Sequence, residues 1–532
     1  MHALVAVVCT APLAWHLDRL PLGAEPVATV PRFNLWTLSW TADRLPHLLA
    51  GWWDAPIFWP VRGTFAFSEP QPLTGAGFAV LRPLTGGPVA YSLLLLIALT
   101  LNGVTADALA RRLGARPAAA ICAGILAQAL PFVFHELGVL QLVMVWPMFA
   151  TLAALLAWCA TPALRHAAGV GLGLAAGVLT CGYYASLFAL CLLVSAPLLV
   201  DRRWWSTGPD ERARRVGGVM VGMATLGVVA VPLVAGQLER LAGRQWQEAT
   251  VLGGSAHWRD WYPSGDLWPG AVLLALAAAG VVLARRRHTT WFFVAFGGVA
   301  LLASAGLRLE VAGLRPWSLL ADHVGALARL RSPFRAAALV EVALVALAVP
   351  ALDRLLADRR RVVRALAPVA VVVAVLTAGV GPGPLEAVPE RPAWAAWLRD
   401  RPDGAAVVWL PFAPGTSVAD FRPTVDAMVA DLGTGHPLFN GYSGFFPTDH
   451  SERRRQLAGF PDPASVRALA DRDVTYVVAD ARWFDDGGRS AAAASLGLTV
   501  LERDPDAVLL ALPSTPGGTS GRLDRGGGSA EE

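Results

Sequence analysis

Long, uninterrupted apolar runs recur along this chain from its first residues to about residue 380. An α-helix needs about 20 apolar residues to cross the ~30 Å hydrocarbon core of a membrane, and most of the runs approach that length. The pattern therefore predicts an α-helical polytopic membrane protein with about 11 transmembrane helices. The predicted spans are 2–16, 88–109, 117–134, 140–159, 167–181, 184–200, 217–236, 269–284, 289–305, 335–353 and 363–381.

Composition supports this fold class. Hydrophobic residues make up 55% of the chain, charged residues make up 16%, and the mean hydropathy is +0.49. These values lie outside the range of soluble globular proteins. The five cysteines lie in or beside the apolar runs without metal-ligand spacing, so we expect small buried hydrophobic residues rather than disulfides or metal ligands.

Arginine clusters follow every second apolar run, and the chain contains no lysine. The clusters are Arg111, Arg112 and Arg116; Arg165; Arg202, Arg203, Arg212, Arg214 and Arg215; Arg285–Arg287; and Arg354, Arg359–Arg361 and Arg364. Short loops rich in arginine stay in the cytoplasm. The amino terminus is therefore predicted to be cytoplasmic, and the chain after the last span extracytoplasmic. The net charge of +4 lies mostly on the cytoplasmic face, where anionic membrane lipids attract it, and does not indicate nucleic-acid binding.

The outer side holds two long segments. Residues 17–87 form a first loop that is too long for a simple connector. Between Asn34 and Trp53 apolar residues recur at helical spacing, with tryptophans among them. This pattern predicts an amphipathic helix lying in the lipid headgroup layer, anchored by its tryptophans.

The second outer segment follows the transmembrane domain, which is predicted to span residues 1–381. Within residues 382–513, buried strands are predicted at 405–410 and 474–479, and short helices at 394–400 and 464–471. This alternation predicts an extracytoplasmic α/β domain. The Gly-rich stretch 514–532 is predicted to be a disordered tail.

Several motifs together resemble the GT-C glycosyltransferases. The matching stretches are Asn34–Trp40, Trp53–Pro60, Phe67–Glu69, the third and fourth spans around Leu140 and Gln141, Gly182–Tyr184, Arg331–Arg335 and Phe439–Pro447. The resemblance covers most of residues 1–505. It implies a multi-pass protein of the bacterial cytoplasmic membrane. Its partners would be membrane lipids and a polyprenyl-phosphate-linked sugar, which it would transfer to an extracytoplasmic acceptor.

One departure from the family pattern bears on activity. Relatives usually place an aspartate a few residues before the asparagine of the first-loop helix, whereas Thr29–Asn34 contains no acid. Either another carboxylate takes that role, or the protein is not a transferase. The alternative function is a non-catalytic membrane protein that binds, moves or scaffolds lipid-linked envelope glycans.

Sugar transfer with inversion requires a base for the acceptor, and the departing lipid phosphate requires positive charge or a metal. Asp54 and Glu69 are the candidate catalytic bases in the first loop; the alternative is that each caps a turn or pairs with Arg62. Arg331 and Arg335 are candidate contacts for the lipid phosphate, since guanidinium groups recognise phosphate in two-point geometry. The alternative is that both only extend toward the membrane interface.

Four further residues are candidate substrate contacts at outer ends of spans. His135, beside Glu136, and Gln141 would bind sugar hydroxyls, and Tyr183 and Tyr184 would stack on a sugar. A divalent metal at His135 and Glu136 is left open as a cofactor, although adjacent helical residues point apart and a solvated pair competes with this interpretation. The tyrosines would equally suit an interfacial aromatic belt.

Overall fold

The computed structural model describes residues 1–199, 208–401 and 404–513. Arg202, Arg203 and the predicted tail 514–532 lie outside the described residues. The chain divides into two compact units. Unit 1 contains Met1–Ala55, Gly63–Pro389 and Ser443–Phe445; unit 2 contains Pro56–Arg62, Glu390–Tyr442 and the chain from Phe446.

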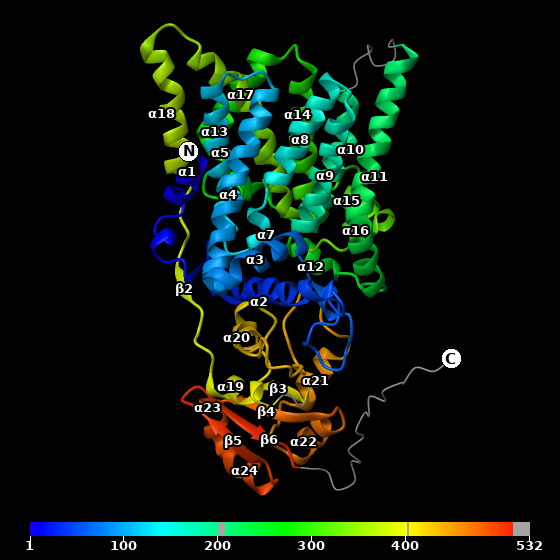
Figure 1. Cartoon of the computed structure of the whole chain (residues 1–532), viewed down its shortest axis with the longest axis vertical. Helices are drawn as coiled ribbons and strands as arrows, with labels where there is room; N and C mark the ends of the chain where they lie inside the picture. The colour runs from blue at the N-terminus through cyan, green and yellow to red at the C-terminus, as the bar shows by residue number, and fades with distance from the viewer. Residues whose placement is uncertain (200–207, 402–403, 514–532) are drawn as a thin grey trace, which may run out of the picture. The chain divides into compact units, whose positions relative to one another are not determined.

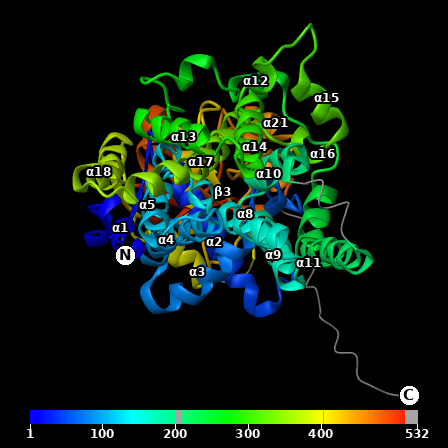
Figure 2. The same cartoon turned by 90° about the horizontal axis from the view of Figure 1, so that it is seen from above.

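Unit 1 is a helical bundle (Figures 1 and 2). Its longer helices are α4 (Gly87–Arg112), α5 (Pro117–Gln128), α8 (Trp146–Ala160), α9 (Leu164–Thr180), α10 (Gly182–Ser195), α11 (Pro209–Arg240), α13 (Ala271–Ala284), α14 (His288–Ser304), α17 (Ala337–Leu356) and α18 (Arg361–Thr377). Among the described residues, six helical stretches are long and apolar enough to cross a membrane, and three shorter helices are also apolar. The predicted multi-pass membrane protein is therefore supported.

The spans differ sharply in how much of them the protein covers. In the stretch Pro333–Leu356, which contains α17, 83% of the apolar window is buried, against 11% in α11. Helix α17 packs against α13, α14 and α5, whereas α11 packs mainly along α9. Figures 1 and 2 both place α11 and α18 at opposite edges of the bundle. Helix α17 is thus the centre of the bundle, and α11 presents most of its apolar surface outward.

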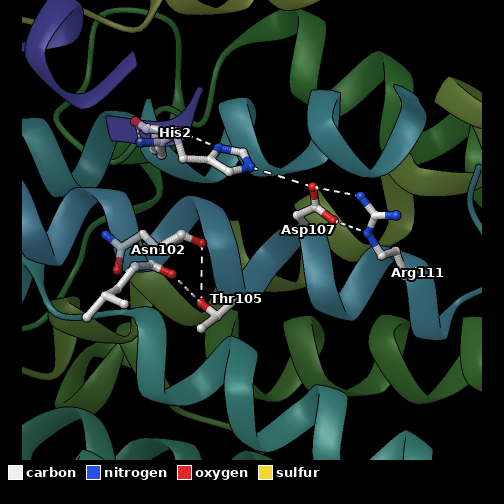
Figure 3. A network of polar contacts seen from close by, with 7 residues as sticks. His2, Asn102, Thr105, Asp107 and Arg111 are labelled. Atoms are coloured by element: carbon white, nitrogen blue, oxygen red, sulfur yellow. Dashed lines mark hydrogen bonds and ion pairs between the residues drawn. The ribbon is translucent and has the colours of Figure 1, made fainter. Parts of the chain in front are cut away.

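The first predicted span contains only a short helix, α1 (His2–Cys9), followed by a 3₁₀ turn at Leu13–Trp15. Polar contacts attach it to α4 and α5. His2 Nε2 lies 3.6 Å from Asp107 Oδ2, and Asp107 also pairs with Arg111 one helical turn away (Figure 3). The pairing of Asp107 with Arg111 confirms what their spacing predicts.

The first-loop helix, α2 (Thr29–Arg44), lies across one end of the bundle (Figure 1). Nearly all of its side chains are buried, and within unit 1 it packs mainly against α3 (Pro72–Thr85). Tryptophan side chains of the first loop form hydrogen bonds within it. Trp40 Nε1 donates to the Trp52 carbonyl at 2.8 Å, and Trp52 Nε1 donates to Thr41 Oγ1 at 3.1 Å. Both rings therefore anchor the loop to itself rather than to lipid.

Two short strands fasten the first loop to the chain beyond α18. Strand β1 (Arg19–Pro21) pairs antiparallel with β2 (Leu385–Ala387). Arg32 of α2, only 2% exposed, donates to Glu386 Oε1 and to the Ala387 carbonyl, both at 2.9 Å. A buried guanidinium is tolerated here because an anion and a carbonyl both accept from it.

Unit 2 contains a four-stranded mixed sheet in the order β3-β4-β6-β5. Strand β3 (Ala406–Leu410) runs parallel to β4 (Val474–Asp480), and β6 (Ala507–Ala511) pairs antiparallel with β4 and with β5 (Thr499–Arg503). Its helices are α19 (Ala393–Arg399), α20 (Arg422–Ala430), α21 (His450–Gln456), α22 (Pro463–Ala470), α23 (Ala481–Asp485) and α24 (Arg489–Ser495).

A piece of the first loop, Pro56–Arg62, belongs to unit 2. Its backbone pairs with Leu438: Trp59 N donates to the Leu438 carbonyl at 2.9 Å, and Leu438 N donates to the Pro56 carbonyl at 3.0 Å. Arg453 of α21 is 3% exposed and donates from Nη1 to the carbonyls of Trp59 and Phe439, at 2.7 and 3.1 Å. Unit 2 is therefore completed by residues that precede most of the spans in sequence.

Replacing Arg453 with alanine should destabilise unit 2 by about 3 kcal/mol, because two carbonyl groups lose their donor. We expect faster pulse proteolysis of the purified full-length protein in urea, with new cleavage sites inside residues 404–513 located by mass spectrometry. Arg455→Ala is the matched control from the same helix, since its side chain is 77% exposed and pairs with the neighbouring Glu452. Its effect should stay below about 1 kcal/mol. Equal effects of the two substitutions would contradict this account.

Candidate functional site

Five charged side chains from separate stretches of unit 1 gather at one place, here called the acid–arginine cluster. Its members are Glu25, Glu69, Glu136, Arg331 and Arg335. Glu25 precedes α2, and Glu69 precedes α3 (Pro72–Thr85). Glu136 follows the short helix α6 (Pro131–His135), and Arg335 lies in the 3₁₀ turn Pro333–Ala336 that leads into α17. Each carboxyl group senses the charge of Arg335.

Tyr183, in the first turn of α10, contacts three members of this cluster. Its backbone N–H donates to Glu69 Oε1 at 2.8 Å, and its hydroxyl accepts from the Arg331 N–H at 2.6 Å. The guanidinium carbon of Arg335 lies 4.7 Å from the centre of its ring. A helix amino terminus favours a nearby carboxylate, and an aromatic face favours a guanidinium. One residue thus holds an acid and two arginines in fixed relation.

The arginines are held by aromatic rings instead of by anions. The guanidinium carbon of Arg331 lies 5.3 Å from the centre of the Trp246 ring, which stacks on Phe445 at 4.3 Å. Within residues 1–199, 208–401 and 404–513, neither guanidinium group of Arg331 and Arg335 forms an ion pair or a hydrogen bond. Both residues are half-buried. The guanidinium donors of both side chains are therefore not used by the described residues.

Close backbone contacts place Glu25 in the cluster. Ala24 N donates to the His135 carbonyl at 3.0 Å. Gly23 has a positive φ of 56°, and a Cβ there would lie 2.9 Å from the same carbonyl. A Cβ on Gly138 would lie 3.0 Å from Glu25 Cγ. Glycine at both positions therefore lets the chain before α2 lie directly on the turn 135–138.

Burial raises the pKa of all three carboxyl groups of the cluster. It raises the pKa of Glu25 to about 7, with Glu136 adding to the rise and Arg335 and Arg331 opposing it. It also raises the pKa of Glu69, against the Tyr183 N–H bond and Arg335. The pKa of Glu136 rises by burial too, against Arg335 and His135. Glu25 therefore changes its charge near neutral pH, which suits a general base.

A buried amide trio adjoins Glu69. Gln71 Nε2 donates to Asn34 Oδ1 at 2.9 Å and to Gln141 Oε1 at 3.3 Å. Asn34 lies in α2, and Gln141 lies in the short helix α7 (Leu140–Val143). Gln141 is thus joined to the first loop, and its side-chain oxygen faces another amide.

Asp54, the other predicted base, lies elsewhere. Its side chain is exposed, and Oδ1 accepts from Gly63 N at 2.8 Å, which closes the turn between them. The structure thus separates the two predicted first-loop acids: Glu69 joins the arginines, while Asp54 caps a turn.

Two further predicted substrate contacts, Tyr184 and His135, differ in how deeply they are buried. Tyr184 is 1% exposed and donates its hydroxyl to the Leu142 carbonyl at 2.9 Å, so its side chain lies in the core. His135 is half-buried, with Nε2 3.9 Å from Glu136 Oε1. In the described part of the chain, no three His, Cys, Asp or Glu side chains are grouped as metal ligands.

Glu25 is the residue that the sequence did not single out. It is the sole acid between Arg19 and Arg32, and it lies before Thr29–Asn34, the stretch in which the resemblance leads one to expect an acid. Its separation from Asn34 in the sequence gives no sign that it lies in the cluster. The turn through Gly23 brings it there.

Replacing Gly138 with alanine should lower the free energy of unfolding by about 1–3 kcal/mol, because the added Cβ meets the Leu22 carbonyl and Glu25 Cγ. The measurement is thermal unfolding of the purified protein in detergent. Gly227→Ala in α11 is the control, since no atom lies within 4 Å of a Cβ there. It should change stability by less than about 0.5 kcal/mol. An unchanged unfolding midpoint for the Gly138 variant would show that the turn is not closely packed.

No known protein family and no curated protein matches the sequence. Solved structures do match the fold. ArnT from Cupriavidus metallidurans in the apo state has a TM-score of 0.52 at 15% identity, covering 96% of both chains. The same protein bound to undecaprenyl phosphate has a TM-score of 0.50 at 14% identity, again covering 96% of both. The arabinofuranosyltransferase AftD from Mycobacteria has a TM-score of 0.50 at 16% identity, over 97% of this chain and 42% of AftD. The chain therefore shares its fold with these solved structures.

Proposed function

We propose that this protein is an integral membrane glycosyltransferase that transfers a sugar from a polyprenyl-phosphate donor to an extracytoplasmic acceptor. The observation that carries the proposal is the arginine pair, Arg331 and Arg335, because neither guanidinium group forms an ion pair or a hydrogen bond among the described residues. A phosphate group matches this pair in charge and in hydrogen-bond geometry.

The likeness to ArnT supports the choice of ligand. ArnT has been solved with undecaprenyl phosphate bound, and it shares the fold along nearly the whole chain. Here a polyprenyl phosphate would place its phosphate on the arginines and its tail among the apolar spans. Arg335 leads directly into α17, so the phosphate would lie where polar and apolar surfaces meet.

Glu25 is the proposed base. In the described chain its carboxyl group has no hydrogen-bond partner, whereas Glu69 accepts from the Tyr183 N–H and lies 3.6 Å from the Cys181 sulfur. Glu25 would take the proton of the acceptor hydroxyl as that oxygen attacks the sugar. The arginines would stabilise the negative charge that grows on the departing phosphate, and Glu69 would orient Arg335 by charge. Tyr183, Gln141 and His135 are proposed to line the surroundings of the sugar.

The proposed location is a bacterial cytoplasmic membrane, with the amino terminus in the cytoplasm. The arginine clusters support this orientation. Arg335 precedes α17, while Arg354 and Arg359–Arg361 lie at or beyond its other end. The acid–arginine cluster and unit 2 would then be extracytoplasmic.

The decisive experiment compares lipid-linked sugars and envelope glycans, by mass spectrometry, in cells with and without the protein. A transferase predicts accumulation of one lipid-linked sugar together with loss of that sugar from an envelope product. Unchanged glycans with an altered distribution of lipid-linked sugars would instead favour the non-catalytic role of binding or moving them.

Replacing Arg331 or Arg335 with glutamine should weaken binding of undecaprenyl phosphate by about 2–3 kcal/mol each, roughly 30- to 150-fold. Lysine should be intermediate, since it keeps the charge and loses the two-point geometry. The measurement is equilibrium binding to the purified protein. Arg315→Gln is the control, because Arg315 is exposed and pairs with Glu248 at 2.7 Å. Full binding by the double glutamine variant would refute the phosphate site.

Replacing Glu25 with glutamine should lower the transfer rate about 10²- to 10⁴-fold. In the unsubstituted protein the rate should rise with pH and level off above about 7, because the ionised form is the base. The rate is measured in membrane vesicles against pH, normalised to protein amount. Asp54→Asn, which alters only a turn cap, should keep the rate within about twofold. The reverse ranking would return the role of base to Asp54.

A further inference from the structure

The stretch Ser443–Phe445 belongs to unit 1, although the chain on both sides of it belongs to unit 2. Its backbone lies against the first loop. Phe445 N donates to the Phe67 carbonyl at 2.8 Å, and a Cβ on Gly444 would lie 2.6 Å from the same carbonyl. Glycine at position 444 allows this close approach. The stretch is thereby fixed to Phe67, which lies two residues before Glu69.

The Phe445 ring contacts Trp246, and the Trp246 ring also contacts Arg331. The rings of Phe445 and Trp246 stack with their centres 4.3 Å apart and an angle of 24° between their planes. Trp246 Nε1 donates to the Arg329 carbonyl at 3.0 Å, and the guanidinium carbon of Arg331 lies 5.3 Å from the centre of the Trp246 ring. The hydrogen bond fixes the edge of the Trp246 ring, and the stacked Phe445 ring fixes its plane.

The backbone of Arg331 is held by other residues. Its N–H donates to the Tyr183 hydroxyl at 2.6 Å, and a Cβ on Gly254 would collide with the Arg331 carbonyl. The guanidinium group lies at the end of a long, flexible side chain, and among the described residues it forms no ion pair or hydrogen bond. The contact that restricts its position is therefore the one with the Trp246 ring.

This contact suits an arginine that has to bind an anion. A guanidinium group on an aromatic face keeps its N–H groups available to an oxyanion. An arginine that is already ordered loses less side-chain entropy when the anion binds, so it contributes more to affinity than a mobile one. Trp246 can thus order Arg331 without occupying its donors.

We propose that Phe445 is a positioning residue for the phosphate site, because it holds Trp246 against Arg331 and so orders the guanidinium group before the phosphate binds. The inference rests on the function proposed above. It makes the affinity for the lipid phosphate depend on a stretch of chain that follows the last span in sequence.

The test measures binding of undecaprenyl phosphate to the full-length protein in nanodiscs. Phe445→Ala should raise the dissociation constant about 3- to 10-fold, the effect of losing one aromatic stacking contact. Phe445→Tyr keeps the ring and should bind within about twofold of the unsubstituted protein. Phe445→Leu keeps an apolar side chain without the flat face, so it should weaken binding in the same direction as alanine and serves if the alanine variant does not fold.

A double-mutant cycle distinguishes positioning of Arg331 from a general disturbance of the fold. In the Arg331→Gln background, Phe445→Ala should have no further effect, because no guanidinium group remains to be positioned. In the Arg335→Gln background it should keep its full effect, because the Arg335 guanidinium lies on a different ring, 4.7 Å from the centre of Tyr183.

Phe446→Ala is the matched control. The Phe446 ring packs within unit 2 against Phe421 and His450, with ring centres 5.1 and 4.6 Å apart, so the dissociation constant should stay within about twofold. Equal effects of Phe445→Ala in the unsubstituted protein and in both glutamine backgrounds would refute the positioning role, as would unchanged binding by the alanine and leucine variants. Absence of binding by the unsubstituted protein would instead refute the phosphate site itself.

Discussion

A charge withdrawn from water must be compensated, and this constraint organises unit 1. Glu341, 1% exposed within α17, accepts from the Phe132 N–H, which lies 3.1 and 3.3 Å from its two oxygens. Arg32 is compensated by Glu386 and a carbonyl. These interactions fasten α6 to α17 and the first loop to the chain after α18. Arg331 and Arg335 differ, because their guanidinium groups form no ion pair or hydrogen bond among the described residues.

The geometry of the acid–arginine cluster depends on backbone as much as on side chains. The Tyr183 N–H donates to Glu69, its hydroxyl accepts from the backbone N–H of Arg331, and its ring contacts the Arg335 guanidinium. Glu25 arrives through the contact of Gly23 and Gly138 with opposing backbone and side-chain atoms. Neither arrangement needs a long side chain to reach across a gap, so the relative positions of acid and arginine vary little with rotamer changes.

Hydrophobic pattern alone predicted the bundle, because apolar runs of this length are rare outside membranes. It also predicted β3 and β4, whose buried residues are continuous, and α19 and α22. Strands β5 and β6 were not predicted. They form a hairpin, and the pairing of β6 with β4 depends on residues that are distant in the sequence. The first-loop helix was predicted, but its burial was not, because tryptophans serve a core and a lipid interface equally well. Within the site, Glu69 and the two arginines lie in recognisable motifs, so the sequence predicted them. The position of Glu25 depends on a turn of the chain that the spacing of residues in the sequence does not reveal.

The residues Pro56–Arg62 raise a question of timing during synthesis. They leave the ribosome early, yet their partners Leu438 and Arg453 are made almost 400 residues later. Until then this segment lacks both the backbone of Leu438 and the guanidinium group of Arg453 as hydrogen-bond partners. Pairing of this segment therefore requires that translation has passed Arg453, and a product truncated anywhere among the spans would display an unpartnered, tryptophan-bearing segment. Quality-control proteases that recognise exposed apolar chain would have a built-in means of distinguishing unfinished molecules from finished ones.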